Sequence, residues 1–186
     1  MLRRRVQRVL HERFDRRVTV VQAGAGFGKT TALGQAVEQN RLLPLGIDVW
    51  LGCEPGDEDG SRLLSGLAAA VGLPDDADRD GVLATLAAHS PTAVCLIVDD
   101  VHEVPHGSEG AAVLQAFIED LPANASVVLA GRVEPPVALA RLEAQEAILA
   151  LIERFPNLRH SDKGFEYHAI PSFRGMTSFW VKTGRE

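Results

Sequence analysis

The chain has 186 residues, of which 46% are hydrophobic, and its formal net charge at pH 7 is -6. This composition excludes a disordered chain and suits a domain of ordinary size with a buried core. No apolar run reaches the roughly 18 to 20 residues that span a bilayer, and the acidic balance argues against nucleic acid as the main partner. Cys53 and Cys95 lack metal-binding spacing, which predicts reduced core residues in a cytoplasmic protein.

The N-terminal segment MLRRRVQRVLHERFDRR is rich in arginine. Arginine-rich amphipathic starts occur in transit peptides. This segment, however, also contains Glu12 and Asp15 and runs directly into the first predicted strand. Its apolar residues recur at helical spacing: Leu2, Val6, Val9, Leu10 and Phe14. We therefore expect a leading helix packed on the domain rather than a targeting signal.

Strands and helices alternate along the next part of the chain. The pattern predicts strands over 17–22, 46–52, 93–99 and 126–131, and helices over 30–39, 61–71, 81–89, 111–121 and 137–154. The strands are continuously apolar, which is typical of a parallel sheet covered by helices on both faces. The expected fold is therefore a three-layer α/β fold. The acidic loops 54–59 and 75–80 are expected to be solvated.

The first strand leads into the segment VVQAGAGFGKTTAL, residues 20–33. It matches the phosphate-binding pattern G-x-x-x-x-G-K-[ST] at every position except the first, where Ala23 replaces glycine. Alanine is acceptable there because that residue shapes the turn and its side chain need not contact phosphate. The dinucleotide-binding pattern G-x-G-x-x-G fails, since Lys29 stands where its third glycine belongs. The alternative is a strand–helix turn without a ligand.

A phosphate-binding loop directs consecutive backbone N–H groups at an anion, beside the positive end of the helix dipole. Glycines leave the phosphates room to approach. Lys29 can reach the outer phosphates, and the Thr30 hydroxyl can bind magnesium. The expected nucleotide-binding residues are Gly24, Ala25, Gly26, Phe27, Gly28, Lys29, Thr30 and Thr31.

A second acidic motif, AVCLIVDD, ends the most apolar predicted strand with Asp99 and Asp100. A carboxylate there can hold magnesium, and a second one can orient an attacking water. Two adjacent aspartates can instead cap a turn, but the phosphate-binding loop favours the interpretation as a site. Thr30 and one of these two carboxylates are therefore the expected magnesium residues. The absence of an N-K-x-D motif argues against a GTPase.

Residues 1 to about 140 resemble the nucleotide-binding domain of the MalT-like, LuxR-type regulators within the STAND class of P-loop ATPases. The resemblance rests on RRVTVVQAGAGFGKTTAL, VWLGCEPGDEDGSRLLSGLAAAV, LIVDDVHEV and VVLAGRVEPPVALARL. It implies an ATP-binding, slowly hydrolysing switch on a parallel sheet. It also implies that the strand ending in the acids is not next to the strand that precedes the phosphate-binding loop.

The resemblance assigns roles to individual residues. Lys29 and Thr30 match the phosphate and magnesium residues, and Asp99 matches the magnesium-associated acid. Asp100 matches the acid that assists hydrolysis, and Arg132, in LAGR, matches an arginine that senses the terminal phosphate. The expected catalytic residues are thus Asp100, Lys29 and Arg132. His102 matches a D-D-x-H pattern of the family and is expected to be structural.

Members of this family are very long chains with a winged-helix segment, an arm of helical repeats and a C-terminal DNA-binding helix-turn-helix. None of these fits in the remaining residues. We therefore expect neither DNA binding, nor inducer sensing, nor a membrane contact from this piece, and the sequence identifies no protein partner.

The C-terminal part differs in composition, since six of the ten aromatic residues follow residue 154. Residues from about 139 to 182 resemble the C-terminal end of haem-thiolate monooxygenases. The pattern C-x-G-x-x-L-A-R would place the haem cysteine at 134, where this chain has Glu134, and a glycine at 136, where it has Pro136. No haem is expected. The segment LARLE, residues 139–143, fits both resemblances, which together imply a fusion, truncation or rearrangement joined between Leu139 and Gln145.

The predicted organisation is a P-loop ATP-binding domain over 1–145, as an incomplete STAND-type module. A C-terminal extension over 146–186 would hold a helix end and a β-hairpin within 165–181. The predicted function is a slow magnesium-dependent ATPase or nucleotide switch of a truncated LuxR-type regulator, with ATP and Mg²⁺ as ligands. The alternatives are a non-catalytic nucleotide-binding remnant or gene-fusion product, and a fragment of a haem-thiolate monooxygenase.

Overall fold

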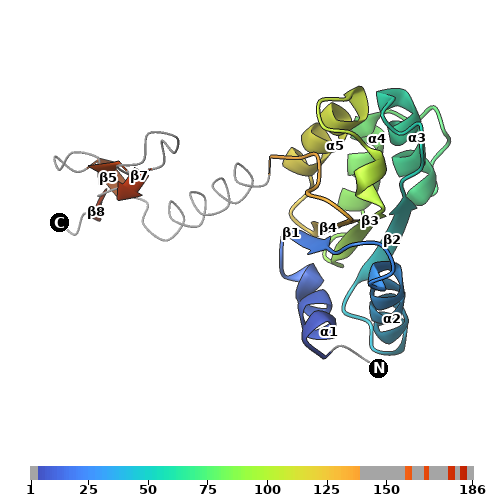
Figure 1. Cartoon of the computed structure of the whole chain (residues 1–186), viewed down its shortest axis with the longest axis horizontal. Coiled ribbons are helices and arrows are strands. Elements are labelled where there is room, and N and C mark those ends of the chain that lie inside the picture. Colours follow the sequence, from blue (N-terminus) through green and yellow to red (C-terminus); the bar gives the residue numbers. More distant parts are fainter. Residues whose placement is uncertain (1–3, 139–157, 161–165, 168–175, 179–180, 184–186) are drawn as a thin grey trace. The chain divides into compact units, whose positions relative to one another are not determined.

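Four parallel strands form the central sheet: β1 (Val18–Gln22), β2 (Ile47–Gly52), β3 (Val94–Asp99) and β4 (Ala125–Gly131). The computed structural model describes residues 4–138, 158–160, 166–167, 176–178 and 181–183 (Figure 1). The strand order is β1-β4-β3-β2. The last strand of the four therefore lies between β1 and β3, as the family resemblance implied. All three strand pairs are parallel.

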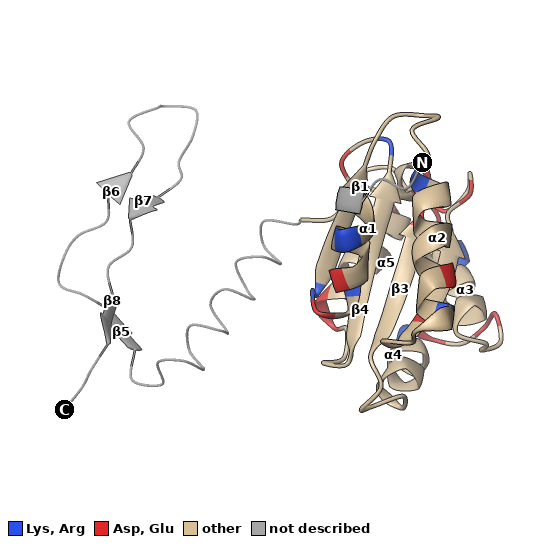
Figure 2. Cartoon of the chain, turned by 90° about the horizontal axis from the view of Figure 1, so that it is seen from below, with Lys and Arg blue, Asp and Glu red and all other residues tan. Residues whose placement is uncertain are grey.

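Helices cover both faces of this sheet (Figures 1 and 2). One face carries α1 (Arg4–His11), the short helix η1 (Glu12–Phe14) and α2 (Lys29–Leu42). The other face carries α3 (Gly60–Ala70), α4 (Arg79–Ala87) and α5 (Glu109–Glu119). A further short helix, η2 (Val101–Glu103), follows β3. The predicted three-layer α/β fold with a parallel sheet is confirmed.

The middle strands β3 and β4 are buried along their whole length, which explains their continuous apolar sequence. Side chains of α1 and α2 pack on one face of these strands. That cluster contains Leu10, Leu33, Ala36, Cys95, Ile97, Val128 and Ala130. The leading helix therefore contributes to the core as expected, although Val9 on its other side is 41% exposed.

Most acidic residues of these two loops are exposed, as expected, but Asp57 is buried and several of the carboxylates also have structural roles. Asp59 accepts hydrogen bonds from the backbone N–H groups of Ser61 and Arg62 and so caps α3, and Asp78 caps α4 in the same way. Asp57 is only 6% exposed. Its Oδ1 lies 3.2 Å from Arg62 Nε, and its Oδ2 accepts a hydrogen bond from the backbone N–H of Glu54. The sequence shows the charge of these loops but not their partners.

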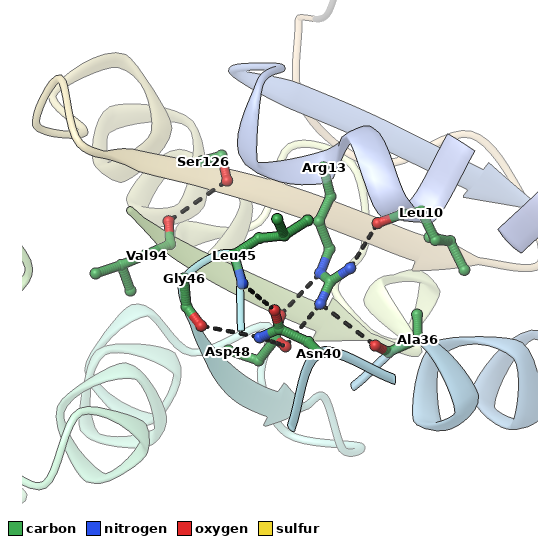
Figure 3. Close-up of polar contacts among 9 residues, drawn as sticks. All are labelled: Leu10, Arg13, Ala36, Asn40, Leu45, Gly46, Asp48, Val94 and Ser126. Atoms are coloured by element: carbon green, nitrogen blue, oxygen red, sulfur yellow. Dashed lines mark hydrogen bonds and ion pairs between the residues drawn. The ribbon is translucent and has the colours of Figure 1, made fainter. Parts of the chain in front are cut away.

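A buried ion pair joins η1 to β2 (Figure 3). Arg13 Nε donates to Asp48 Oδ1 at 2.8 Å, and a terminal nitrogen of Arg13 donates to Asp48 Oδ2 at 2.7 Å. The same guanidinium also donates to the carbonyl oxygen of Leu10 at 2.6 Å. Asn40 of α2 donates to Asp48 Oδ2 at 2.9 Å and to the carbonyl oxygen of Gly46. Each charged group thus has several hydrogen bonds, which burial of a charge requires.

The chain divides into two compact units, Met1–Val137 and Ala138–Glu186. In the second unit, β5 (Leu158–His160) pairs antiparallel with β8 (Val181–Thr183), and β6 (Glu166–Tyr167) pairs antiparallel with β7 (Met176–Ser178). The predicted boundary at 145/146, the join between Leu139 and Gln145, and most of the predicted helix over 137–154 lie outside the described residues. The hairpin within 165–181 stays a prediction, because most of that range is also outside them. Among the described helices, none combines the length and the apolar composition that crossing a membrane would need.

Candidate functional site

The loop between β1 and α2 has the backbone shape that its glycines predict. Gly26 and Gly28 adopt positive φ angles of 76° and 74°, which residues with a Cβ rarely adopt. The backbone N–H of Ala23 donates to the carbonyl oxygen of Gly131, so the start of the loop is tied to the end of β4. Alanine at position 23 therefore keeps the backbone contact that this position makes.

The N-terminus of α2 differs from those of the neighbouring helices. Asp59, Asp78 and Ser108 cap α3, α4 and α5 with side-chain hydrogen bonds. The residue that precedes α2 is Gly28, which has no side chain to bond the first N–H groups. A helix start of this kind directs free N–H groups and the positive end of the helix dipole at an anion.

Lys29 lies at the start of α2 with its ammonium group turned back over the loop. Its Nζ donates to the carbonyl oxygen of Ala23 at 2.8 Å and to that of Gly24 at 3.3 Å. These two oxygens hold the charge directly above the loop. A bound phosphate would offer the same nitrogen a charged acceptor, which makes a stronger hydrogen bond than a carbonyl oxygen.

Thr30 and Asp99 meet across the site although they are 69 positions apart in the chain. The Thr30 hydroxyl donates to Asp99 Oδ2 at 2.8 Å. Asp99 is 3% exposed at the end of β3, and its Oδ1 accepts the backbone N–H of Asp100. The hydroxyl and the carboxylate form a pair of oxygen ligands of the kind that Mg²⁺ prefers. Among the described residues, no group of three or more His, Cys, Asp and Glu side chains is placed to hold a metal ion.

A single hollow of about 370 Å³, called here the phosphate-side hollow, joins the predicted residues. Asp100 and Arg132 line it together with the loop, because the carboxyl ends of parallel strands lie at one edge of the sheet. The full lining is Ala25, Gly26, Gly28, Lys29, Thr30, Thr31, Asp100 and Arg132. Three other predicted residues, Gly24, Phe27 and Asp99, are not part of this lining.

The acidic side of the site influences Cys53, the residue after β2. Burial, together with the negative charges of Asp57, Asp100, Asp99 and Glu103, raises the pKa of the Cys53 thiol to about 12. The carboxylates therefore create a local negative potential at this edge of the sheet. Such a potential favours a cation beside Asp99.

A second hollow, of about 400 Å³, lies on the other side of the loop and is called here the α1-side hollow. Phe27, which is 61% exposed, and Gln7 of α1 are among its lining residues. Gln7 Nε2 donates to the carbonyl oxygen of Ala32 and to Gln35 Oε1. Sequence reasoning missed this hollow. The sequence did contain a signal for it. Gln7 is three residues before buried Leu10, so its amide side chain lies on the buried side of the leading helix.

The residues present fit a nucleotide phosphate chain with magnesium. An added Cβ at Gly26 or Gly28 would meet no atom within 4 Å, so the space above the loop is open. The donors facing that space are the uncapped N–H groups of α2, Lys29 and Arg132, and the acceptors beside it are Asp99 and Asp100. Cationic donors suit phosphate oxygens, while the hydroxyl–carboxylate pair suits a hard cation.

Comparison with known proteins gives one curated relative. The chain is 23% identical over 154 residues to the HTH-type transcriptional regulator MalT of Yersinia enterocolitica serotype O:8 / biotype 1B. The match covers 73% of this chain and 16% of the regulator. No family model matches the chain. The resemblance of residues 139–182 to haem-thiolate monooxygenases receives no support from these comparisons.

The fold is shared with a solved structure. The Orc1 protein of Aeropyrum pernix, determined in complex with DNA, has a TM-score of 0.53 and 16% identity, covering 75% of this chain and 39% of that one. Cdc6p of Pyrobaculum aerophilum has a TM-score of 0.48 and 17% identity, covering 72% of this chain and 40% of that one. The sequence match and the shared fold together support a nucleotide-binding domain of the P-loop ATPase type.

Proposed function

We propose that this chain binds ATP with Mg²⁺ and hydrolyses it slowly, as the nucleotide-dependent switch of a LuxR-type transcriptional regulator. The phosphate-side hollow is the observation that carries the proposal. This hollow brings together the loop, Lys29, Thr30, Asp100 and Arg132. Asp99 accepts a hydrogen bond from Thr30. The match to MalT supports placing the switch in a regulator of that type.

Each residue has a role that its position supports. The ammonium group of Lys29 would exchange its loop carbonyl partners for oxygens of the outer phosphates. The Thr30 hydroxyl and the Asp99 carboxylate would hold Mg²⁺, which neutralises phosphate charge when bound. Asp100, whose side chain is 45% exposed in the hollow, would accept the proton of the attacking water. Arg132 would contact the terminal phosphate.

The α1-side hollow is the proposed place for the base and ribose. Its size falls within the range of small-molecule pockets. It borders the same loop as the phosphate-side hollow, so one ligand can occupy both. Its apolar residues, which include Val6 and Val21, suit the faces of a nucleotide base, and its glutamine side chains can form hydrogen bonds with the polar edges of that base.

DNA binding is not assigned to this piece. A formal net charge of -6 disfavours contact with a polyanion. The chain spans 16% of the length of the MalT relative, so the partners and the signal of a whole regulator are outside the proposal.

Calorimetry of ATP binding, with and without magnesium, tests the proposal. We expect a saturable site whose affinity for ATP rises when magnesium is added, together with slow release of phosphate in a turnover assay. Binding without turnover would favour the alternative of a non-catalytic nucleotide-binding remnant. No binding of ATP under either condition would contradict the proposal.

A further inference from the structure

His102 is a buried side chain that the proposed mechanism does not use. Only 10% of its side chain is exposed. Its Nδ1 lies 3.7 Å from Asp100 Oδ1, and its Nε2 lies 3.3 Å from Glu103 Oε1. Both ring nitrogens are shielded from solvent, yet neither has a hydrogen-bond partner. Buried polar atoms are nearly always hydrogen-bonded, so an imidazole in this state calls for an explanation.

The turn that carries His102 also fixes the backbone of Asp100. Asp100 has a φ of 52°, and it is the one residue other than glycine with positive φ in the part of the chain that the structure describes. Its carbonyl oxygen accepts the N–H of Glu103 at 2.9 Å. Val101, fully buried, packs so closely on the end of β4 that an added Cβ at Gly131 would lie 3.0 Å from it. The imidazole and the carboxylate are therefore held by one tightly packed turn.

A strained conformation at this point has a functional meaning when it directs a side chain. Residues outside the common φ/ψ regions persist where the surroundings over-determine them, and they cluster at active sites. Here the left-handed conformation belongs to Asp100, which lines the phosphate-side hollow. The Nδ1 of His102, which has no hydrogen-bond partner, lies 3.7 Å from Oδ1 of this carboxylate.

We propose that His102 is a positioning residue for Asp100. In the nucleotide-bound protein, its Nδ1–H donates to Asp100 Oδ1 and holds the carboxylate toward the attacking water. The inference rests on the proposed function, because it assigns a role within ATP hydrolysis. The present 3.7 Å exceeds a hydrogen bond of about 2.7 to 3.2 Å. Hydrogen bonds of catalytic groups are often long without substrate and shorten when it binds.

The Glu103 carboxylate lies beside the other ring nitrogen. Its Oε1 lies beside Nε2, on the side away from Asp100, and the Glu103 side chain is 33% exposed. His102 itself contacts neither the phosphates nor the water in this scheme, so its effect on hydrolysis passes entirely through Asp100.

Three substitutions separate positioning from simple packing. The amide nitrogen of asparagine replaces Nδ1, which faces Asp100, whereas that of glutamine replaces Nε2, which faces Glu103. His102→Ala should lower the single-turnover rate of ATP hydrolysis by about tenfold or more, with the dissociation constant for ATP within about twofold of the parent. His102→Asn should recover part of the rate, and His102→Gln should not. The control is His106→Ala, at an exposed histidine four residues further on, which should change neither quantity.

A double variant tests the route through Asp100. In an Asp100→Asn background, His102→Ala should cause no further loss of rate, because the group that it positions is already inactive. Rates equal to the parent in His102→Ala, or equal losses in the Asn and Gln variants, would overturn the inference. If His102→Ala does not fold, the Asn and Gln pair decides by the same criterion.

ATP binding and hydrolysis by the parent protein distinguish a failure of this inference from a failure of the proposed function. A parent that binds ATP but does not hydrolyse it would overturn the role of His102 and leave nucleotide binding intact. A parent that does not bind ATP would overturn the proposed function itself. Slow hydrolysis in the parent, combined with the asparagine-specific recovery, is the result that supports both.

Discussion

The ammonium group of Lys29 donates to two carbonyl oxygens of its own loop, so its charge already lies where the outer phosphates would bind. Hydrogen bonds to charged groups contribute roughly 1.5 to 3 kcal/mol each, or about ten- to a hundredfold in affinity. We expect Lys29→Ala to weaken ATP binding at least tenfold in calorimetry, with the circular dichroism spectrum unchanged.

Arg41→Ala is a matched control for this variant. It removes an exposed positive charge from the last turn of the same helix, where Arg41 pairs only with exposed Glu38 among the described contacts. Its ATP affinity should equal that of the parent. If Lys29→Ala also binds ATP like the parent, the loop is not a phosphate-binding loop.

The two aspartates after β3 differ in environment and should differ in effect. Buried Asp99 accepts the Thr30 hydroxyl, so Asp99→Asn should reduce the gain in ATP affinity that magnesium provides. Asp100→Asn should leave ATP affinity nearly unchanged and slow hydrolysis by about a hundredfold or more. Asparagine tolerates the left-handed backbone of position 100, so the turn should survive. Parent-like binding and turnover in both variants would mean that these acids only stabilise the turn.

Site residues could be predicted from the sequence where a short, continuous pattern identifies them. The loop pattern predicted Lys29 and Thr30, and the end of the apolar strand predicted Asp99 and Asp100. Their meeting depends on strand order, which the family resemblance supplied and local periodicity does not contain. Gln7 was missed because its hydrogen-bond partners come from a segment distant in the chain. Asp57 was missed because distant Gly110 packs on its backbone, although its polar partners Arg62 and Glu54 are near in sequence. A polar residue that is buried by tertiary contacts looks, in sequence, like a solvated one.

At the scale of elements, the Arg13–Asp48 pair fastens the leading helical segment to the sheet. Both side chains are nearly inaccessible, with 2% and 6% exposure, and Asn40 of α2 shares the same carboxylate. Removal of one partner leaves a buried charge without compensation, which costs about 3 to 5 kcal/mol. Asp48→Ala should therefore lower the free energy of unfolding by about that amount in urea denaturation.

Two further variants show whether the loss of stability in Asp48→Ala comes from breaking the buried ion pair. Glu38→Ala breaks the exposed pair with Arg41 and should change stability by less than about 1 kcal/mol. The double variant Arg13→Met/Asp48→Leu removes both charges and should be less destabilised than Asp48→Ala. A loss below about 1 kcal/mol in Asp48→Ala would contradict the assignment of this pair as a structural clamp.

At the scale of the whole molecule, the two free, buried cysteines link stability to alkaline pH. Burial raises the pKa of Cys95 and of Cys53 to about 12, from an ordinary value of 9.0. Because the pKa is raised in the folded state, the stabilising contribution is complete below pH 9 and is lost as pH rises toward 12. The free energy of unfolding should fall by about 1.4 kcal/mol per pH unit for each thiol well above pH 9.

Urea denaturation at a series of pH values measures this effect. The variant Cys53→Ala/Cys95→Ala should show a smaller decline above pH 9 than the parent, since other groups titrate equally in both proteins. Identical slopes would mean that the thiols ionise in the folded protein as easily as in the unfolded one.

The position of β4 has a consequence for the order in which the protein acquires its properties during translation. Strand β1 is made first, but among the described strands it pairs only with β4, which is made last of the four. A nascent chain that ends before Ala125 can pair β2 with β3, while β1 and the loop after it have no neighbouring strand, and Ala23 lacks its anchor at Gly131. Any ligand that needs the loop, Asp99 and Arg132 together can be bound only after β4 has inserted. We therefore expect nucleotide affinity to arise in one step after β4 has been synthesised, which would make a ribosome-bound chain insensitive to ATP before that strand pairs.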